Sequence, residues 1–209
     1  MWWRRRPEAA ADERWVVLDV ESSGLDPARD RLLAIAAVAV QTAGERPWID
    51  FADSFEVLLR RAGEGEPPDK ANILVHGLGV GEQGRGVEPS DALKSFERYV
   101  GHSPLLGFHV GFDRQLIERA FDATLGRRWE RRWLDIEPLA ALTHPEAKAR
   151  ALDDWLVHFG IVCSVRHQAA ADALATAELL LRLWPALRRE RATRFEACAR
   201  MAAQRRWLA

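Results

Sequence analysis

The sequence predicts an α/β protein whose mixed sheet is flanked by helices, and two observations support this prediction. Three apolar segments near the N-terminus, at 15–21, 31–41 and 49–59, have the length or the alternation of β-strands. Beyond residue 89, segments with helical spacing alternate with short strand-like segments. Strands followed by alternating helices and strands are typical of an α/β sandwich with a mixed sheet. The length of 209 residues favours one main domain.

The three N-terminal segments are predicted strands for different reasons. The first, 15–21, opens with Val-Val-Leu and acquires acidic residues only towards its end. The run 31–41 fits a helix or a strand by pattern alone, but its length and its Gly- and Pro-bounded surroundings favour a strand. In 49–59, Phe51, Phe55 and Val57 all occupy odd positions. This spacing predicts that they share one face of a third strand.

The remaining elements follow from turn signals and helical spacing. Residues 61–89 are rich in glycine and proline, which predicts a loop with a short helix near 72–78. A helix starts at Ser90, continues with apolar residues at helical spacing and stops at Gly101. Two more strands are expected at 104–110 and 132–136. Further helices are expected at 111–126, 137–142, 151–159, 169–187 and 193–207.

Composition narrows the class of protein. A net charge of −1 and a pI near 6.6 do not suggest a general nucleic-acid binder, so any such binding must depend on local charge or on metal. Cys163 and Cys198 lack metal-ligand or redox spacing, which favours free thiols in a reducing compartment. The N-terminus lacks the apolar segment of a signal peptide, and no apolar run is long enough to span a bilayer. We therefore expect a soluble cytoplasmic protein.

The chain is expected to divide into three parts. Residues 1–13 form a flexible N-terminal arm, 14–187 form the main domain, and 188–209 form an arginine-rich C-terminal helical extension. The arginines of this extension suit a solvated helix face. A surface that faces phosphates or docks a partner is the alternative interpretation.

Four acidic residues stand beside apolar elements. Asp19 and Glu21 are two positions apart on a predicted strand, so they point to the same side. Asp113 follows another strand, and Asp172 falls in the first turns of a long apolar helix, where the helix dipole favours negative charge. Carboxylates in a buried setting are costly without a compensating charge, and 16–21 contains no lysine or arginine. Oxygen donors of this kind suit Mg²⁺ or Mn²⁺.

A histidine accompanies these acids. His167 lies just before the helix that carries Asp172. A titratable imidazole beside a metal site is a natural general base for activating water.

Four short segments occur in the order and at the spacing of a known set of motifs. They are DVESSGL at 19–25, VHGL at 75–78, FD at 112–113 and HQAAAD at 167–172. Together they resemble the motifs of the DnaQ-like 3′–5′ exonucleases of the DEDDh type, a family that includes the proofreading epsilon subunit of bacterial DNA polymerase III. The resemblance extends over about 15–183.

The resemblance implies an RNase H-like fold with a mixed five-stranded sheet flanked by helices. It also implies 3′–5′ exonuclease activity that releases nucleoside 5′-monophosphates, with two divalent cations, Mg²⁺ or Mn²⁺, as cofactors. By this resemblance, the metal ligands are Asp19, Glu21, Asp113 and Asp172, and all four are catalytic together with His167, the general base. The implied substrate-binding residues, next to the terminal nucleotide, are Ser22, Leu25, His76 and Phe112.

Each residue also has a simpler interpretation. Asp19 and Glu21 suit a solvated strand end, and Asp113 a helix N-cap. Leu25 and Phe112 suit core packing, and the histidines suit surface or loop positions. In addition, Phe108-His109 stands where the family usually has His-Asn, which puts substrate preference in doubt. We expect core packing, not base stacking, at Trp15, Trp48, Trp133 and Trp155.

The expected substrate is a single-stranded nucleic acid end, DNA rather than RNA, in proofreading or repair. The Ser-Ser after Glu21 favours a polymerase proofreading subunit, so a DNA polymerase subunit is a candidate partner. A stand-alone exonuclease is an equal alternative, because no clear Gln-x-x-Leu clamp-binding peptide occurs near the C-terminus. The further alternatives are an RNA-trimming exoribonuclease of the RNase T kind and a non-catalytic docking module on the same fold.

Overall fold

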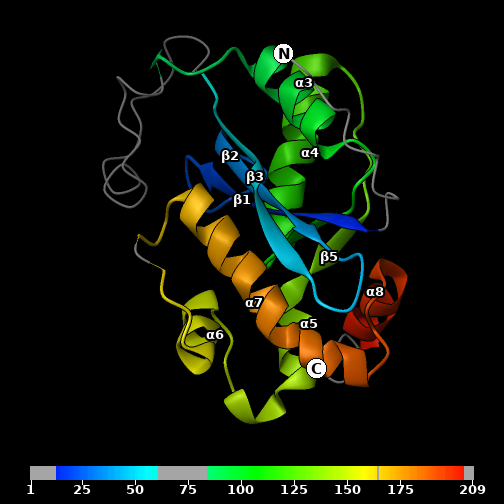
Figure 1. The fold of residues 1–209 in the computed structure, drawn as a ribbon. Coiled ribbons are helices and arrows are strands. Elements are labelled where there is room, and N and C mark those ends of the chain that lie inside the picture. The colour runs from blue at the N-terminus through cyan, green and yellow to red at the C-terminus, as the bar shows by residue number, and fades with distance from the viewer. Residues whose placement is uncertain (1–12, 61–83, 164, 205–209) are drawn as a thin grey trace.

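A computed structural model describes residues 13–60, 84–163 and 165–204 and contains one five-stranded sheet flanked by helices (Figure 1). The strand order is β3-β2-β1-β4-β5. β1 is antiparallel to β2 and parallel to β4, so the sheet is mixed as predicted. The strands are β1 (Arg14–Ser22), β2 (Leu32–Gln41), β3 (Trp48–Leu58), β4 (Leu105–Gly107) and β5 (Trp133–Asp135).

The helices lie close to their predicted positions. They are α3 (Pro89–Val100), α4 (Gly111–Leu125), α5 (Ile136–Thr143), η1 (Pro145–Ala147), α6 (Leu152–Phe159), α7 (Ala169–Arg189) and α8 (Phe195–Gln204). The short helix predicted near 72–78 lies outside the described residues. No helix in the described ranges combines the length and the apolar character needed to cross a lipid bilayer.

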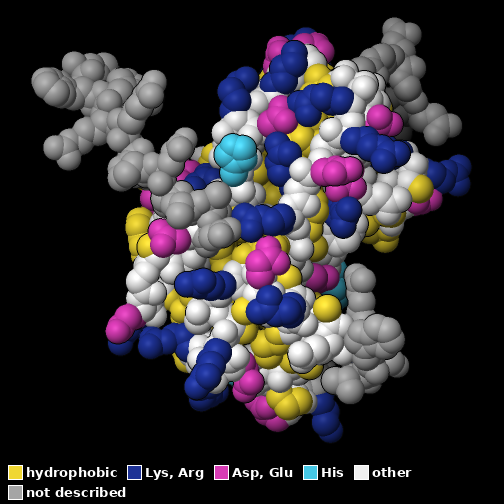
Figure 2. All heavy atoms as spheres, turned by 90° about the vertical axis from the view of Figure 1, so that its right-hand side faces the viewer, with side chains coloured by type: hydrophobic (Ala, Val, Ile, Leu, Met, Phe, Trp, Pro, Cys, Tyr) yellow, Lys and Arg dark blue, Asp and Glu magenta, His cyan; other side chains and the backbone are white. Residues whose placement is uncertain are grey.

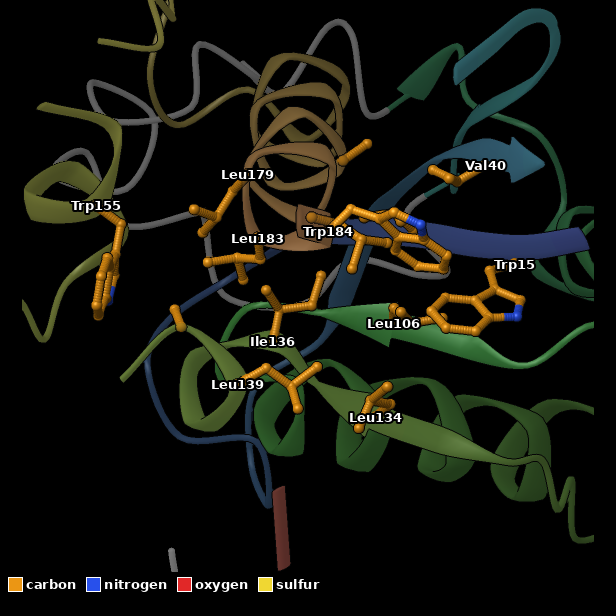
Figure 3. Close-up of a cluster of buried hydrophobic side chains, with 14 of the residues drawn as sticks. Trp15, Val40, Leu106, Leu134, Ile136, Leu139, Trp155, Leu179, Leu183 and Trp184 are labelled. Carbon is orange, nitrogen blue, oxygen red and sulfur yellow. The ribbon is translucent and has the colours of Figure 1, made fainter. Parts of the chain in front are cut away.

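Alternate residues of β1 enter two different hydrophobic cores, because successive side chains of a strand point to opposite faces. Trp15 and Val17 face α7, where the indole of Trp15 meets that of Trp184 with ring centroids 5.6 Å apart. This core also receives residues of α5 and α6 (Figure 3). Val16 and Leu18 pack instead with α3 and α4 on the opposite face. The odd-numbered side of β1 is therefore the α7 side.

The prediction for β3 is wrong in one respect, because Phe51 and Trp48 do not join the core. Phe51 is 68% exposed and Trp48 is 52% exposed, whereas Val57 is buried. Val38 pairs with Ser54 but the next residue, Ala39, pairs with Asp50, so a bulge removes 51–53 from the ladder. The bulge breaks the alternation on which the prediction relied. Of the other tryptophans expected in the core, Trp15 and Trp155 are buried and Trp133 is half-buried.

The described part of the C-terminal extension packs onto the main core. α7 continues past the predicted boundary at 187, and α8 buries Phe195 and Cys198. The ring of Phe195 meets Trp15 edge to face, with centroids 6.2 Å apart. The Cys198 Sγ donates a hydrogen bond to the Ala192 carbonyl. That this extension forms a part separable from the domain stays a prediction.

Replacing Phe195 with alanine should lower the free energy of unfolding by about 3 kcal/mol or more, because it removes a buried ring and leaves a cavity beside Trp15. Phe51→Ala is the matched control, since that ring is exposed, and should change stability by less than about 0.5 kcal/mol. Urea unfolding followed by circular dichroism measures both. Equal effects for the two variants would show that α8 contributes nothing to the core.

Candidate active site

Two neighbouring parallel strands bring the first acidic residues together. Asp19 and Glu21 lie on the odd-numbered, α7-facing side of β1. β4 runs parallel to β1 with Val17 opposite Leu106, so the segment that follows β4 starts beside Asp19. The chain folds back closely on itself after β4, because a Cβ atom at Gly107 would lie only 2.8 Å from the Val110 side chain. Asp113 therefore enters at the same end of the sheet as Asp19 and Glu21.

Asp113 lies in the first turn of α4 and is buried. The N-cap position is occupied by Val110, so the simpler interpretation of Asp113 as an N-cap is wrong. The carboxylate accepts hydrogen bonds from its own backbone N–H and from that of Val20 on β1. These two bonds tie the start of α4 to the strand that carries Asp19 and Glu21.

Asp172 arrives from the far end of the chain, in the first turn of α7, and is also buried. Its Oδ2 accepts a hydrogen bond from the His167 backbone N–H at 3.1 Å, and its Oδ1 pairs with the Arg166 guanidinium. Glu21 reaches the same helix, because its carboxylate accepts the N–H of Ala169, the first residue of α7. A helix N-terminus favours negative charge, which suits both carboxylates.

These side chains line one cavity of about 460 Å³. It contains every predicted site residue that the structure describes, namely Asp19, Glu21, Ser22, Leu25, Phe112, Asp113, His167 and Asp172. The predicted residue His76 lies outside the described residues. Residues from four separate stretches of the chain, in and just after β1, between β4 and the first turn of α4, at the start of α6 and around the start of α7, thus meet at one place.

Burial and mutual repulsion raise the pKa of the carboxyl groups in this cavity. Burial is the largest cause for Asp19, and the charges of Asp113, Asp172 and Glu21 add to it, so the pKa of Asp19 lies well above its usual range. Burial raises the pKa of Glu21 to about 8, with Asp172 contributing. Burial also raises the pKa of Asp113 to about 8, and Asp135 contributes there. These carboxyl groups therefore keep their protons to a higher pH than they would in water, and a bound cation would favour their ionised form.

The donor set fits hard divalent cations. The four side chains offer only carboxylate oxygens, the ligands that Mg²⁺ and Mn²⁺ prefer. Within the described ranges, the Oε1 atom of Glu21 is buried and has no hydrogen-bond partner. In the described part of the chain, no three Asp, Glu, His or Cys side chains lie close enough together to hold a metal ion. The positive charge next to Asp172 is the guanidinium of Arg166.

A short loop after β1 forms one lip of the cavity and holds Leu25 in solvent. Asp30 organises the loop, because its two oxygens accept the Ser23 hydroxyl at 2.9 Å and the Asp26 N–H at 2.8 Å. A side chain at Gly24 would collide with Asp30, with a Cβ only 2.5 Å from its carboxylate. Leu25 is 92% exposed, so its interpretation as a core residue is wrong. An apolar side chain held out beside a polar cavity suggests a contact with ligand.

A second lip of the cavity is formed by residues around Phe112. Phe112 is half-buried, packs against the α3–α4 core and also lines the cavity. His109, one of the two residues that depart from the family motif, has a left-handed backbone with φ 54°. Its N–H donates to Asp135 Oδ1 at 2.9 Å. Asp135 also caps α5 through the Glu137 N–H, so this carboxylate fixes the loop that enters the site.

His167 is exposed at the cavity, and its backbone is held more firmly than the sequence suggests. The position of His167 before the helix indicates only a loop, but its N–H bonds to Asp172, and the residue has φ 62°. Non-glycine residues rarely adopt this left-handed conformation, and they do so where the surroundings enforce it. His167 lines the same cavity as the carboxylates.

The sequence analysis missed Arg166, which belongs to the site, and its partner Asp153, which lies outside the cavity lining. Arg166 lines the cavity and forms ion pairs with Asp172 and with Asp153 on α6. Two features of the sequence could have identified Arg166. It directly precedes His167, and the segment 16–21 that carries Asp19 and Glu21 contains no arginine or lysine of its own. The pairing with Asp153 had no signal, because only tertiary structure places the start of α6 there.

Comparison with known proteins identifies the family to which the chain belongs. A family model described as Exonuclease (RNase_T) matches residues 16–180. The chain is 29% identical over 190 residues to a DNA polymerase III subunit epsilon-like protein of Rhodobacter capsulatus. It is 27% identical over 176 residues to the PolC-type DNA polymerase III of Listeria monocytogenes. These alignments cover 88% and 84% of this chain, but only 25% and 12% of the two relatives.

Solved structures show the same fold. Exonuclease I of E. coli in complex with a dT13 oligonucleotide superposes with a TM-score of 0.67 at 18% identity, covering 85% of this chain and 42% of that one. Exonuclease I of Methylocaldum szegediense gives a TM-score of 0.69 at 19% identity, covering 86% and 42%. The predicted RNase H-like exonuclease fold is confirmed.

The raised pKa values predict how stability depends on pH in the presence of a chelator. Glu21 and Asp113 have folded-state pKa values of about 8, above the values of about 4 that such groups have in unfolded chains. The folded state therefore binds more protons, so the contribution of these two groups is fully present below about pH 4 and is lost as the pH rises through about 8. The melting temperature in EDTA should fall between about pH 5 and about pH 8.

Calorimetry at several pH values measures this, with Glu21→Gln as the control that removes one of the two groups. The variant should show a flatter decline, and Mg²⁺ or Mn²⁺ should restore wild-type stability most at the alkaline end. A wild-type melting temperature that rises with pH over this window would contradict the electrostatic description of the site.

Proposed function

Because the chain belongs to the exonuclease family, we propose that it is a divalent-metal-dependent 3′–5′ exonuclease that releases nucleoside 5′-monophosphates from single-stranded ends, DNA in preference to RNA. The observation that carries the proposal is the meeting of Asp19, Glu21, Asp113 and Asp172 with His167 in one cavity. A structural role alone would not require four carboxylates at one point with a single arginine lining the same cavity among the described residues.

The proposed roles follow from position and chemistry. Asp19, Glu21, Asp113 and Asp172 would hold two cations, Mg²⁺ or Mn²⁺, which when bound supply the positive charge that activates water and stabilises the leaving 3′-oxygen. His167, exposed at the same cavity, accepts the proton of the attacking water. The hydrogen bond from its backbone to Asp172 keeps the imidazole beside the carboxylates.

The two lips of the cavity suit a terminal nucleotide. Leu25 presents an exposed apolar surface on which the last base can pack, and Phe112 lines the same cavity with an aromatic ring. Ser22 lines the same cavity and has a hydroxyl for the sugar or phosphate. A cavity of about 460 Å³ accommodates one nucleotide better than a duplex end. We propose the same contact role for His76.

The preference for DNA and for single strands rests on the relatives and on surface charge. The two relatives are named as parts of DNA polymerase III, and the E. coli neighbour is bound to a dT13 oligonucleotide. On the face shown in Figure 2, basic and acidic side chains are interspersed and form no broad cationic surface. Binding then depends on the site itself and not on general attraction to phosphates.

The names of the relatives also suggest the cellular setting. A DNA polymerase subunit is the proposed partner, in proofreading or repair. The cytoplasm is the proposed compartment, because Cys163 and Cys198 are both free thiols.

The direct test compares labelled single strands of DNA and RNA. With 3′-labelled DNA the label should be released at once as mononucleotide, whereas 5′-labelled DNA should shorten stepwise, and EDTA should stop both reactions. Activity in EDTA, or initial release from the 5′ end, would contradict the proposal. Faster turnover of RNA would favour the RNase T-like alternative instead.

Replacing Asp19 with alanine should lower kcat by at least about a hundredfold and leave the protein folded. The metal loses a ligand, while the repulsion among Asp19, Glu21 and Asp113 is relieved, so stability in chelator should not fall. Asp122→Ala removes an exposed carboxylate from the same helix as Asp113 and is the matched control. Normal cleavage by the Asp19 variant would exclude Asp19 from the machinery and support a docking module.

Replacing Leu25 with alanine should raise KM by roughly three- to tenfold, with a smaller effect on kcat, because the terminal base loses its apolar contact. Stability should stay within about 0.5 kcal/mol of the wild type, since Leu25 is 92% exposed. Val157→Ala, on an equally exposed part of α6, is the control. An unchanged KM for the Leu25 variant would show that this lip does not touch substrate.

A further inference from the structure

Arg166 occupies an unusual position in the site. It lies in the segment between α6 and α7, and among the described residues it is the only arginine or lysine that lines the cavity. Its side chain is 24% exposed, so the guanidinium is largely withdrawn from solvent. A cation at this position directly faces the carboxylates that would hold metal.

The guanidinium joins two carboxylates that differ in burial. One nitrogen, Nη1, pairs with Oδ1 of Asp172, whose side chain is 8% exposed. Another nitrogen, Nε, pairs with Oδ1 of Asp153, whose side chain is 61% exposed. Asp153 belongs to the first turn of α6 and does not line the cavity. Arg166 therefore has one partner inside the acidic cluster and one outside it.

Arg166 and a divalent cation would compete for the carboxylate of Asp172. Oδ2 of Asp172 is engaged by the His167 N–H, and Oδ1 carries the guanidinium, with the Cys163 Sγ 3.8 Å away. A divalent cation on Oδ1 would be repelled by a guanidinium left at contact distance. The guanidinium must therefore leave Asp172 when the cation arrives, and the fork geometry of arginine allows it to stay on Asp153.

We propose that Arg166 is a built-in counter-cation of the acidic cluster that exchanges with the divalent cation at Asp172, while Asp153 retains the displaced guanidinium. In this role Arg166 is a positioning residue and takes no part in bond breaking. It lowers the repulsion among the carboxylates when no metal is bound, and it makes metal binding weaker than the carboxylates alone would give. The inference rests on the metal binding in the proposed function.

A purely structural role makes a different prediction. If the two ion pairs only hold the loop before α7 in place, then removing either Arg166 or Asp153 should disorder Asp172 and weaken metal binding. Under exchange, the two removals have opposite effects. Loss of Arg166 removes the competitor, whereas loss of Asp153 leaves the guanidinium with Asp172 as its remaining partner and makes its displacement harder.

The test measures Mn²⁺ affinity of the full chain by titration calorimetry and by the electron paramagnetic resonance signal of unbound Mn²⁺, at fixed pH and salt. Arg166→Gln should bind Mn²⁺ about tenfold more tightly than the wild type, and Asp153→Asn roughly threefold more weakly. In EDTA, Arg166→Gln should melt at a lower temperature than the wild type, and saturating Mn²⁺ should remove the difference.

Two further variants complete the test. Arg114→Gln removes the same charge from the ion pair with Glu118, outside the cavity, and should leave Mn²⁺ affinity within about twofold of the wild type. Arg166→Lys keeps the charge without the fork and should lie between the wild type and Arg166→Gln. It also carries the test if the glutamine variant does not fold.

Weaker or unchanged Mn²⁺ binding by both Arg166 variants would overturn the exchange, even if the wild type binds Mn²⁺ well and the proposed function stands. A wild-type chain that binds no Mn²⁺ at millimolar concentration would instead overturn the proposed metal-dependent function, and the exchange with it.

Discussion

The mutual repulsion of carboxylates in one partly buried cavity is the constraint on which the site depends. Burial already raises the pKa of Asp19, and each neighbouring acid raises it further. Such an arrangement persists only if its backbone is rigid and if positive charge is at hand. The hydrophobic residues that alternate with the acids on β1 supply the rigidity, since Val16, Leu18 and Val20 are buried on the other face. Arg166 supplies one positive charge, at Asp172.

The topology of the sheet meets this constraint with few elements. β1 and β4 are parallel neighbours, so the residues that follow them lie at the same end of the strands, where α4 and α7 also begin. Helix starts offer unpaired backbone N–H groups, and those at the start of α7 and near its approach bond to Glu21 and Asp172. The same fold recurs in exonuclease I, and the matched family region spans most of this chain. The chain also covers only 25% and 12% of the two polymerase relatives, so the comparison concerns the exonuclease region of those proteins.

The loops around the acids are organised by further carboxylates that do not join them. Asp30 holds the loop that exposes Leu25, and Asp135 holds the left-handed turn at His109. Asp153 holds Arg166 from outside the cavity. In each case a carboxylate oxygen accepts hydrogen bonds that fix a loop or side chain beside the cavity, while the carboxylate itself is not part of the cavity lining. The acids of this region therefore fall into two groups, those that line the site and those that shape it.

The sequence by itself determined the order of strands and helices along the chain, the acids that share a face of β1, and the family to which the chain belongs. These features depend on local periodicity and on short motifs, which can be read along the chain. Only the tertiary structure decided that Phe51 lies outside the core, because a three-residue bulge against β2 breaks the alternation. Only it decided that α8 buries Phe195 against Trp15, and that Arg166 pairs with Asp153 and Asp172. Register shifts and ion pairs between distant elements depend on how the whole chain packs, and no local pattern specifies them.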